Sequence, residues 1–344
     1  FSSDNAGPAH PKVMNAIMQA NASYAPGYGA DAFTDAARQQ VRDVFEAPDA
    51  AVEFVINGTS ANALLLATMS QPWDTIFCAD VAHIQEDECN APEFYSQAKL
   101  TLVPSVDGKM TPEALRAKIM AEQNRGVHGP QRGPLSITQV TEKGTVYTLA
   151  ELKALTGIAK EYGVATHLDG ARFSNAVVTL GCSPADMSWK AGFDCVCFGG
   201  TKNGLMGVEA VIFFDPEHAW EFELRRKRGA HLSSKHRYLS AQMVAYLTDD
   251  LWLDLATKAN AAGQRLADGL RATNQVTFPN EPDANLMFFD APRGLHQKVQ
   301  AAGAQYYLSG ALEGDADEIV QGRLVCDWSV GFEGVDAFLN ALKA

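Results

Sequence analysis

The stretch FDCVCFGGTKNG, residues 193–204, decides the fold of this chain and the chemistry expected of it. Residues 193–198 are mostly apolar or aromatic over a short run, which predicts a buried strand rather than a helix. Gly199 and Gly200 end this strand and let the backbone bend around Lys202. A lysine in a partly desolvated pocket has a lowered pKa and can form a Schiff base with a carbonyl compound. The alternative is a solvated surface lysine, and residues upstream favour the pocket.

Alternating strands and helices begin at residue 51 and predict an α/β unit with a mainly parallel sheet flanked by helices. The predicted strands are residues 51–56, 75–79, 100–103, 134–139, 164–168, 193–198 and 208–214, with helices at 63–69, 111–123 and 149–162. Before this unit, helices are predicted at 12–21 and 34–46. After it, we predict a helical region at 240–271, strands at 285–289 and 322–326, and helices at 294–302 and 335–344.

The length of 344 residues suits two domains. We predict an N-terminal arm with helices over residues 1–45, a large cofactor-binding domain over 46–250, and a smaller C-terminal α+β domain over 251–344. The formal net charge of -13 argues against a nucleic-acid or anionic-membrane surface. No apolar run approaches a membrane span, and the start of the chain lacks a secretory signal pattern, so we expect a cytoplasmic protein. Cys195 and Cys197 face one side of a predicted strand and are either metal ligands or, as we expect, buried apolar residues.

A turn into a helix follows the first predicted strand and is a candidate anion site. Gly58 lets the backbone turn, and Thr59 and Ser60 offer hydroxyl groups. The free N–H groups of the new helix and its dipole favour a phosphate. The alternative is an ordinary N-cap, which needs only one of the hydroxyl groups.

Two further predicted strands end in polar side chains at the crevice where open α/β sheets bind ligands. His83 follows the strand at 75–79, and its ring either stacks on a flat cofactor or is structural. Asp169 follows the strand at 164–168, where a buried acid needs a cationic partner. That partner is either a protonated pyridine nitrogen or Arg172, three residues on. Arg172 alternatively binds a carboxylate in bidentate fashion.

Three other segments carry weaker signals. Residues 24–31 form a Gly/Tyr loop that suits plain surface, a lid or a subunit contact. Residues 221–237 are dense in cations, and most of these predict a solvated face, although His231, Lys235 or Arg237 could meet a phosphate. Arg323 lies inside an apolar strand and therefore needs an anionic partner.

In this order along the chain, these features resemble the pyridoxal-phosphate enzymes of the aspartate-aminotransferase fold, and most closely the threonine aldolase and β-eliminating lyase family. The resemblance implies that Lys202 carries the cofactor as a Schiff base, that Asp169 pairs with the pyridine nitrogen, and that His83 stacks on the ring. The residues implied to contact pyridoxal 5'-phosphate are Gly58, Thr59, Ser60, His83, Asp169, Arg172, Thr201 and Lys202. Those implied to hold the substrate carboxylate are Ser3, Arg172 and Arg323. No metal site is implied.

Two segments depart from the family pattern. Many members carry Glu-Asn-Thr-His where this chain has TQVTE at residues 138–142, so a second active-site histidine is missing. This leaves the general base open, with His83, acting through water, as the candidate. The family's Gly-Gly-Gly-Met-Arg is replaced by LSSKHR at residues 232–237, which leaves open which cation meets the phosphate.

The family resemblance implies retro-aldol cleavage of a β-hydroxy-α-amino acid, such as threonine, allo-threonine or phenylserine, to glycine and an aldehyde. The enzymatic alternative is β-elimination from a related amino acid. A third alternative is a catalytically silent protein of this fold that binds a partner, and the presence of Lys202, Asp169, Arg172 and Arg323 together argues against it. The resemblance also implies a homo-oligomer, a dimer or tetramer, with sites built across subunits.

Overall fold

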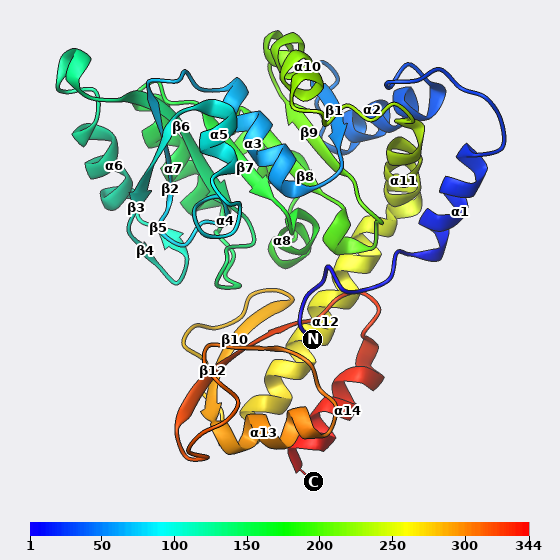
Figure 1. Ribbon diagram of the computed structural model, residues 1–344, viewed down its shortest axis with the longest axis vertical. Coiled ribbons are helices and arrows are strands. Elements are labelled where there is room, and N and C mark those ends of the chain that lie inside the picture. Colours follow the sequence, from blue (N-terminus) through cyan, green and yellow to red (C-terminus); the bar gives the residue numbers. More distant parts are fainter. Residues whose placement is uncertain (344) are drawn as a thin grey trace.

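The computed structural model describes residues 1–343 and has two lobes, a large upper one and a small lower one in Figure 1. The large lobe is built on a seven-stranded sheet with the order β1-β9-β8-β7-β6-β2-β3. These strands are β1 (Ala51–Val55), β2 (Asp74–Ala79), β3 (Lys99–Val103), β6 (Gln131–Thr138), β7 (Thr166–Gly170), β8 (Cys195–Gly199) and β9 (Glu209–Phe213). Strand β9 is antiparallel to both of its neighbours, β1 and β8, and the other pairings are parallel. This confirms the predicted mainly parallel sheet.

Helices cover both faces of this sheet, because side chains alternate along each strand. Cys195 and Cys197 of β8 point into one apolar cluster, whereas Val196 and Phe198 point into another on the opposite face. The two sulfur atoms are therefore buried among apolar side chains, as expected. The first cluster is closed by α3 (Gly58–Thr68) and α10 (Ala219–Arg228), and the second by α2 (Ala32–Val44), α7 (Leu149–Glu161), α8 (Phe173–Leu180) and α11 (Arg237–Leu247).

The remaining elements of the large lobe are short or lie at its edges. They are α1 (Pro11–Ala20), α4 (His83–Glu86), α5 (Ala91–Ser96), α6 (Pro112–Ala121), α9 (Pro184–Met187), the hairpin β4 (Ser105–Val106) and β5 (Lys109–Met110), and the 3-10 turns η1 (Gly126–His128), η2 (Trp189–Ala191), η3 (Thr201–Asn203), η4 (Pro216–His218) and η5 (Thr248–Asp250). Side-chain caps fix several helix starts. Asp31 caps α2, and Thr148 begins α7 in a reciprocal pair with Glu151.

The small lobe packs a sheet on two helices. Its antiparallel strands, in the order β10-β12-β11, are β10 (Leu286–Pro292), β12 (Ile319–Val325) and β11 (Tyr307–Leu308), and its helices are α13 (Arg293–Ala301) and α14 (Gly331–Lys343). Helix α12 (Leu251–Arg271) runs from the large lobe into the small one (Figure 1). Leu255 belongs to the large core, whereas Leu266 belongs to the core of the small lobe. The predicted smaller C-terminal α+β domain is confirmed.

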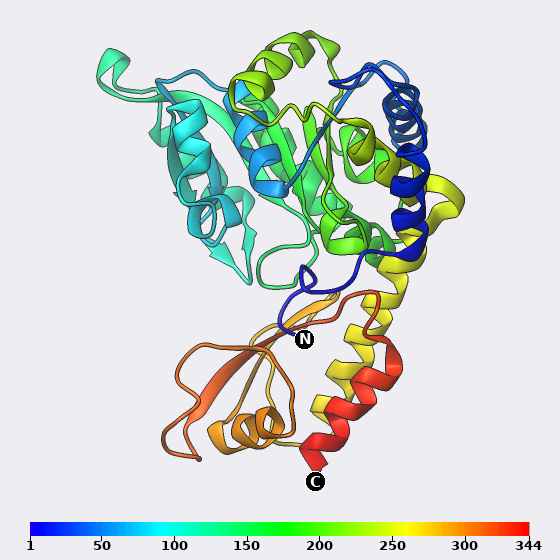
Figure 2. The same ribbon diagram turned by 45° about the vertical axis from the view of Figure 1, so that its right-hand side comes forward.

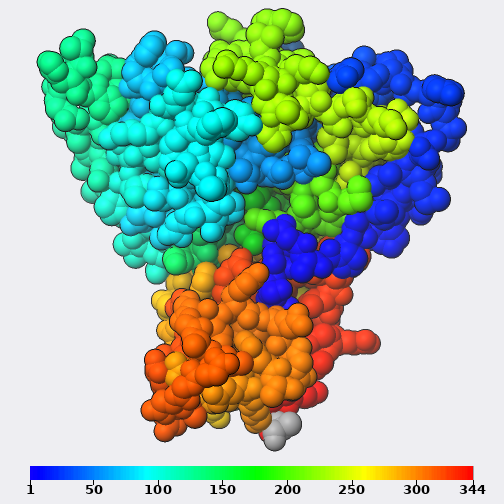
Figure 3. All heavy atoms as spheres, in the orientation of Figure 1, coloured from blue at the N-terminus to red at the C-terminus, as the bar shows by residue number. Residues whose placement is uncertain are grey.

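The N-terminal arm lies at the junction of the two lobes, as Figures 2 and 3 show. The Phe1 carbonyl accepts a hydrogen bond from the Val325 N–H, and the Phe1 ring meets Phe338 edge-on. The arm therefore contacts the small lobe, although the large lobe follows it in the chain. The predicted boundaries at residues 45 and 250 stay predictions.

Several predicted elements differ from the observed ones. Helix α3 begins at Gly58 rather than residue 63, because Asn57 caps it. The predicted helical region 240–271 is broken by η5, where Asp249 and Asp250 have positive φ angles. Helices α5, α8 and α10 were not predicted. Within residues 1–343, no helix is both long enough and apolar enough to cross a membrane.

Candidate active site

The candidate site is a cavity of about 340 Å³ at one edge of the large sheet. Strands β2, β6, β7 and β8 end at this edge because they are parallel, and β1 ends there because two antiparallel pairings separate it from β8. Strand β9 begins at the same edge with Glu209, which lies opposite both Val55 and Gly199. The predicted site residues that line this cavity are Gly58, Thr59, His83, Asp169, Arg172, Thr201 and Lys202.

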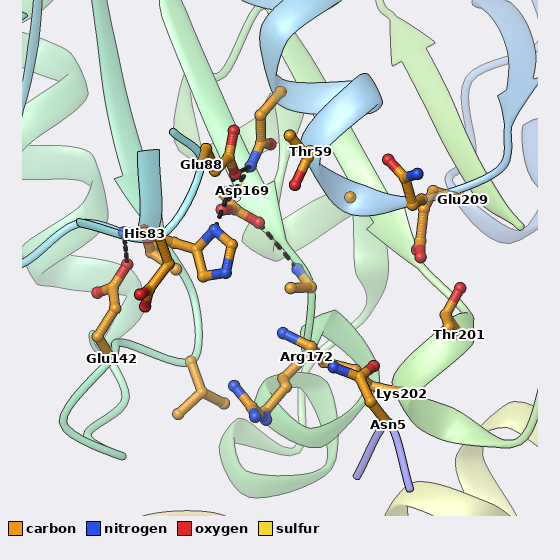
Figure 4. Close-up of a pocket in the computed structure, with 17 residues that line it drawn as sticks. Asn5, Thr59, His83, Glu88, Glu142, Asp169, Arg172, Thr201, Lys202 and Glu209 are labelled. Atoms are coloured by element: carbon orange, nitrogen blue, oxygen red, sulfur yellow. Dashed lines mark hydrogen bonds and ion pairs between the residues drawn. The ribbon is translucent and has the colours of Figure 1, made fainter. Parts of the chain in front are cut away.

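Lys202 enters the cavity from η3, directly after β8 (Figure 4). Gly199 is required before it, since a Cβ there would lie 2.7 Å from the Ala171 carbonyl oxygen. The two chain segments that carry Lys202 and Arg172 can therefore approach closely. Burial and the nearby charge of Arg172 lower the pKa of Lys202, so its amine loses a proton more readily than a surface lysine does.

Asp169 belongs to a buried hydrogen-bond network that extends to His83. Its Oδ2 accepts a 2.9 Å hydrogen bond from Asn62 Nδ2, which also donates to Glu88 Oε1 at 2.8 Å. The same Glu88 oxygen lies 2.8 Å from His83 Nδ1. This hydrogen bond raises the pKa of His83 in spite of the ring's burial, and burial raises the pKa of Glu88. The network holds the His83 ring in place.

Two further acids, half-buried Glu142 and buried Glu209, line the cavity on opposite sides (Figure 4). Glu142 Oε1 accepts a 2.7 Å hydrogen bond from the backbone N–H of His83. Glu209 Oε2 accepts a 2.8 Å hydrogen bond from the backbone N–H of Gly200, beside Lys202. Burial raises the pKa of each carboxyl to about 7, so both titrate near neutral pH.

The predicted anion turn is the first turn of α3. Of its three predicted phosphate ligands, Ser60 is used by the helix N-cap, whereas Gly58 and Thr59 are not. Asn57 Oδ1 accepts the Ser60 N–H at 2.8 Å, and Ser60 Oγ donates to the Asn57 carbonyl at 2.8 Å. Ser60 is thus used by the cap and does not line the cavity. Gly58 and Thr59 do line it, and their N–H groups have no acceptor among residues 1–343.

Arg172 makes a buried, bidentate ion pair with Asp4. Arg172 Nε lies 2.7 Å from Asp4 Oδ2, and Nη2 lies 3.0 Å from Oδ1. The alternative in which Asp169 and Arg172 pair with each other is therefore wrong. Burial would raise the pKa of Asp4, but the charges of Arg172 and Lys202 hold it below its usual value.

Neither Ser3 nor Arg323 lines the cavity. Ser3 Oγ accepts the Asn5 N–H at 3.1 Å, and Asn5 is the arm residue on the cavity wall. Arg323 Nη1 donates to the Ser2 carbonyl at 3.2 Å, with its guanidinium 5.9 Å from the Tyr307 ring centre. Burial lowers the pKa of Arg323, and the charge of Arg172 lowers it further.

None of His231, Lys235 and Arg237 lines the cavity of this chain. Arg237 Nε donates to the Ala20 carbonyl at 3.0 Å. His231 Nε2 lies 3.4 Å from the Tyr95 hydroxyl. Arg237 and His231 thus pack against other elements of the same chain, and Arg226 of the same cation-rich stretch is buried and paired with Glu53.

The cavity contains residues that the sequence patterns did not single out as site residues: Asn5, Asn57, Asn62, Asp87, Thr138, Val140, Glu142, Ala171 and Glu209. A signal existed for two of them. Glu209 is an acid in an otherwise apolar strand, and the same pattern drew attention to Arg323. Glu142 lies in the TQVTE run that departs from the family pattern.

Comparison with known proteins agrees with this architecture. The model of the β-eliminating lyase family matches residues 1–292. The low specificity L-threonine aldolase of Pseudomonas aeruginosa is 40% identical over 97% of this chain and 94% of its own length, and that of a Pseudomonas species is 38% identical over 95% and 92%. The solved structure of Leishmania major threonine aldolase superimposes with a TM-score of 0.92 at 25% identity, covering 100% of this chain and 98% of its own. The chain therefore belongs to the β-eliminating lyase family, as the resemblance of its motifs implied.

Proposed function

We propose that the protein is a pyridoxal-phosphate-dependent aldolase that cleaves a β-hydroxy-α-amino acid to glycine and an aldehyde. The observation that carries this proposal is the convergence of Lys202, Asp169 and His83 on one cavity, each from the end of a strand. The names of the two Pseudomonas relatives support aldol cleavage as the reaction.

The cavity residues fit pyridoxal 5'-phosphate. The N–H groups of Gly58 and Thr59 lie at the start of an 11-residue helix, where a phosphate is favoured. A Cβ at Gly58 would meet nothing within 4 Å, so there is open space above this turn. Asp169 is buried, with amide donors and no cation bonded to it among residues 1–343, and a protonated pyridine nitrogen would supply its missing countercharge.

Each role that the family resemblance implies can be assigned to a side chain of this protein. When bound, pyridoxal phosphate supplies an electron sink for the bonding pair released at Cα of the amino acid. Lys202 would hold the cofactor through its amine, and its lowered pKa would make the neutral amine available to move a proton at Cα of the amino acid. Asp169 would hold a proton on the cofactor nitrogen, because its negative charge is buried. The His83 ring, fixed by Glu88, would lie against the cofactor and exclude water.

We expect threonine or phenylserine to yield glycine and the matching aldehyde, with little 2-oxo acid. The fold alone also supports transamination and elimination, so the products decide the reaction. Glycine, aldehyde, ammonia and 2-oxo acid are measured in parallel after incubation with each amino acid. Ammonia and 2-oxobutyrate from threonine would assign the protein to β-elimination instead.

Substrate carboxylate binding is proposed for Arg323 and Arg172, with Ser3 at the same side of the site. Arg323 makes a single hydrogen bond, to a carbonyl oxygen. Arg172 uses Nε and Nη2 in its pair with Asp4, which leaves Nη1 to donate to a substrate carboxylate. We expect Arg323→Leu to raise KM for the amino acid about 10- to 100-fold, because a charge-assisted hydrogen bond contributes about 1.5 to 3 kcal/mol. Cofactor absorbance should be unchanged. Loss of the cofactor or of the fold would show that Arg323 is structural.

We also propose that the protein is a cytoplasmic homo-oligomer whose sites combine residues from two subunits. Tyr24 and Tyr28 are exposed in the loop at residues 24–31, and Lys227 lies 4.7 Å from the Tyr28 ring centre. This loop and the exposed cations Lys227, Arg228 and Lys235 lie on the surface, where a second copy could use them. Sedimentation should show a dimer or larger species, and a fully active monomer would contradict the proposal.

A further inference from the structure

The proton acceptor for the substrate hydroxyl is the role that the family pattern leaves open in this chain, because the second histidine is missing. Glu142 occupies the segment where that histidine would lie, and it lines the cavity. In the view of Figure 4, Lys202 enters from the side of β8 and Glu142 from the opposite side, with the His83 ring between them. Glu142 thus lies on the wall of the cavity opposite Lys202.

The two carboxylate oxygens of Glu142 have different surroundings. Oε1 is fixed by the backbone N–H of His83 at 2.7 Å. Oε2 is buried and has no hydrogen bond of normal distance and angle among residues 1–343, although the Thr138 hydroxyl is near enough to lower the pKa of this carboxyl. Buried oxygens without a donor are uncommon and costly. A substrate hydroxyl is a donor of the right kind, and it would satisfy Oε2.

His83 is less suited to accept this proton. Its Nδ1 is engaged by Glu88 Oε1 at 2.8 Å, and this interaction raises the pKa of the ring. The ring therefore keeps a proton more readily, and a protonated imidazole has no lone pair left to accept another. The hydrogen bond to Glu88 orients the His83 ring, which suits stacking on the cofactor instead.

The charge environment of Glu142 suits a general base. Burial raises its pKa to about 7, and the negative charge of Asp169 acts in the same direction. A base that titrates near the working pH combines a useful deprotonated fraction with adequate basicity. The other titratable or charged groups of the cavity and of the elements around Glu142 are Cys78, His83, Asp87, Glu88, Tyr147, Arg172, Lys202 and Glu209.

We propose that Glu142 is the catalytic base that takes the proton from the β-hydroxyl of the substrate, an inference that rests on the proposed aldol cleavage. As the O–H bond breaks, its proton moves to Oε2 and its electron pair becomes the second C–O bond of the aldehyde. The pair of the broken Cα–Cβ bond stays at Cα, which then takes up a proton to become the methylene of glycine. Glu142 returns its proton to solvent.

The first test compares Glu142→Gln with a matched buried glutamate. Gln keeps an oxygen for the His83 N–H but cannot accept the hydroxyl proton. We expect kcat for threonine cleavage to fall about 10²- to 10⁴-fold, the usual contribution of a general base, with KM nearly unchanged. Glu122→Gln is the control, because Glu122 is 8% exposed, bonds Thr101 Oγ1 and does not line the cavity. Its activity should equal that of the parent protein.

Two readouts separate a base from a structural residue. Glycine has no β-hydroxyl, so Glu142→Gln should exchange the α-hydrogen of glycine for deuterium at the parent rate, as followed by NMR. An infrared titration of the parent should show two carboxyls that ionise near pH 7, those of Glu142 and Glu209, and the variant should keep only the signal of Glu209. For the parent, kcat/KM should rise with pH through about 7, because the base must be ionised, and Glu142→Gln should lack this limb.

Each result either supports or contradicts the assignment of Glu142 as the base. Cleavage by Glu142→Gln within a few-fold of the parent would overturn the assignment, as would an equal loss of cleavage and glycine exchange. Because the fold could suffer, circular dichroism and cofactor absorbance are measured on Glu142→Gln and on Glu142→Asp, and the Asp variant should recover part of the activity. A parent protein that cleaves no β-hydroxy-α-amino acid would instead refute the proposed function itself.

Discussion

Replacing Lys202 by alanine is expected to abolish cofactor attachment and to reduce cleavage to background. Lys202 is the cavity lysine, and burial and the charge of Arg172 lower its pKa, which makes its amine nucleophilic near neutral pH. Removing a residue that acts covalently typically costs on the order of 10⁴ to 10⁶ in kcat. The purified parent protein should be yellow, and the variant should lack the absorbance of the bound cofactor.

Chemical labelling provides an independent check on this lysine. Borohydride reduction of the parent protein should fix the cofactor to one peptide, which contains Lys202. Lys190 is the matched control, since it is partly exposed and paired with Glu46, and Lys190→Ala should keep both absorbance and activity. A label on Lys190 or on Lys235 would show that the assignment of Lys202 is wrong.

The site residues that can be predicted from the sequence are those that follow the ends of predicted strands. His83, Asp169 and Lys202 each follow a short apolar run, and parallel strands bring such positions to one edge of a sheet. Nothing more than the order of strands and turns was needed to place them together. The family membership, which was implied by the resemblance of the motifs to a known family, and the α/β architecture with a smaller C-terminal domain are both confirmed.

The pairing of long polar side chains could not be predicted, because it depends on contacts between distant segments. Arg172 pairs with Asp4, which is 168 positions away in the chain. The hydroxyl of Ser60 is used by the helix cap, a local choice between two hydroxyl groups that composition does not decide. Glu209 reaches the site only because β9 is antiparallel and begins at the edge where its neighbours end.

Asp4 joins three parts of the molecule at one buried carboxylate. It belongs to the N-terminal arm, it pairs with Arg172 after β7, and its Oδ2 also accepts a 3.3 Å hydrogen bond from Asn285, which precedes β10 of the small lobe. Asn285 in turn donates to the Cys326 carbonyl at 2.8 Å. The carboxylate therefore connects the arm and both lobes next to the cavity.

We expect Asp4→Asn to lower the free energy of unfolding by about 3 to 5 kcal/mol, because it leaves the buried Arg172 cation without its countercharge. Urea denaturation should show a lower midpoint with an unchanged slope. Asp336→Asn is the matched control, since Asp336 forms a bidentate pair with Arg265 on the surface and should change the midpoint little.

The pH dependence of the stability difference between parent and Asp4→Asn shows whether the Asp4–Arg172 charge pair causes it. The pKa of Asp4 is held below its usual value in the folded protein, so its contribution is fully present above the pKa of an unfolded aspartate and is lost as the pH falls through the folded pKa. Parent and Asp4→Asn should therefore differ by a constant amount around neutral pH and converge only in acid. Adding Arg172→Leu to Asp4→Asn should recover part of the lost stability, because no unpaired charge then remains buried. A gap that persists in acid, or a double variant less stable than Asp4→Asn, would show that packing of the arm rather than the charge pair stabilises this junction.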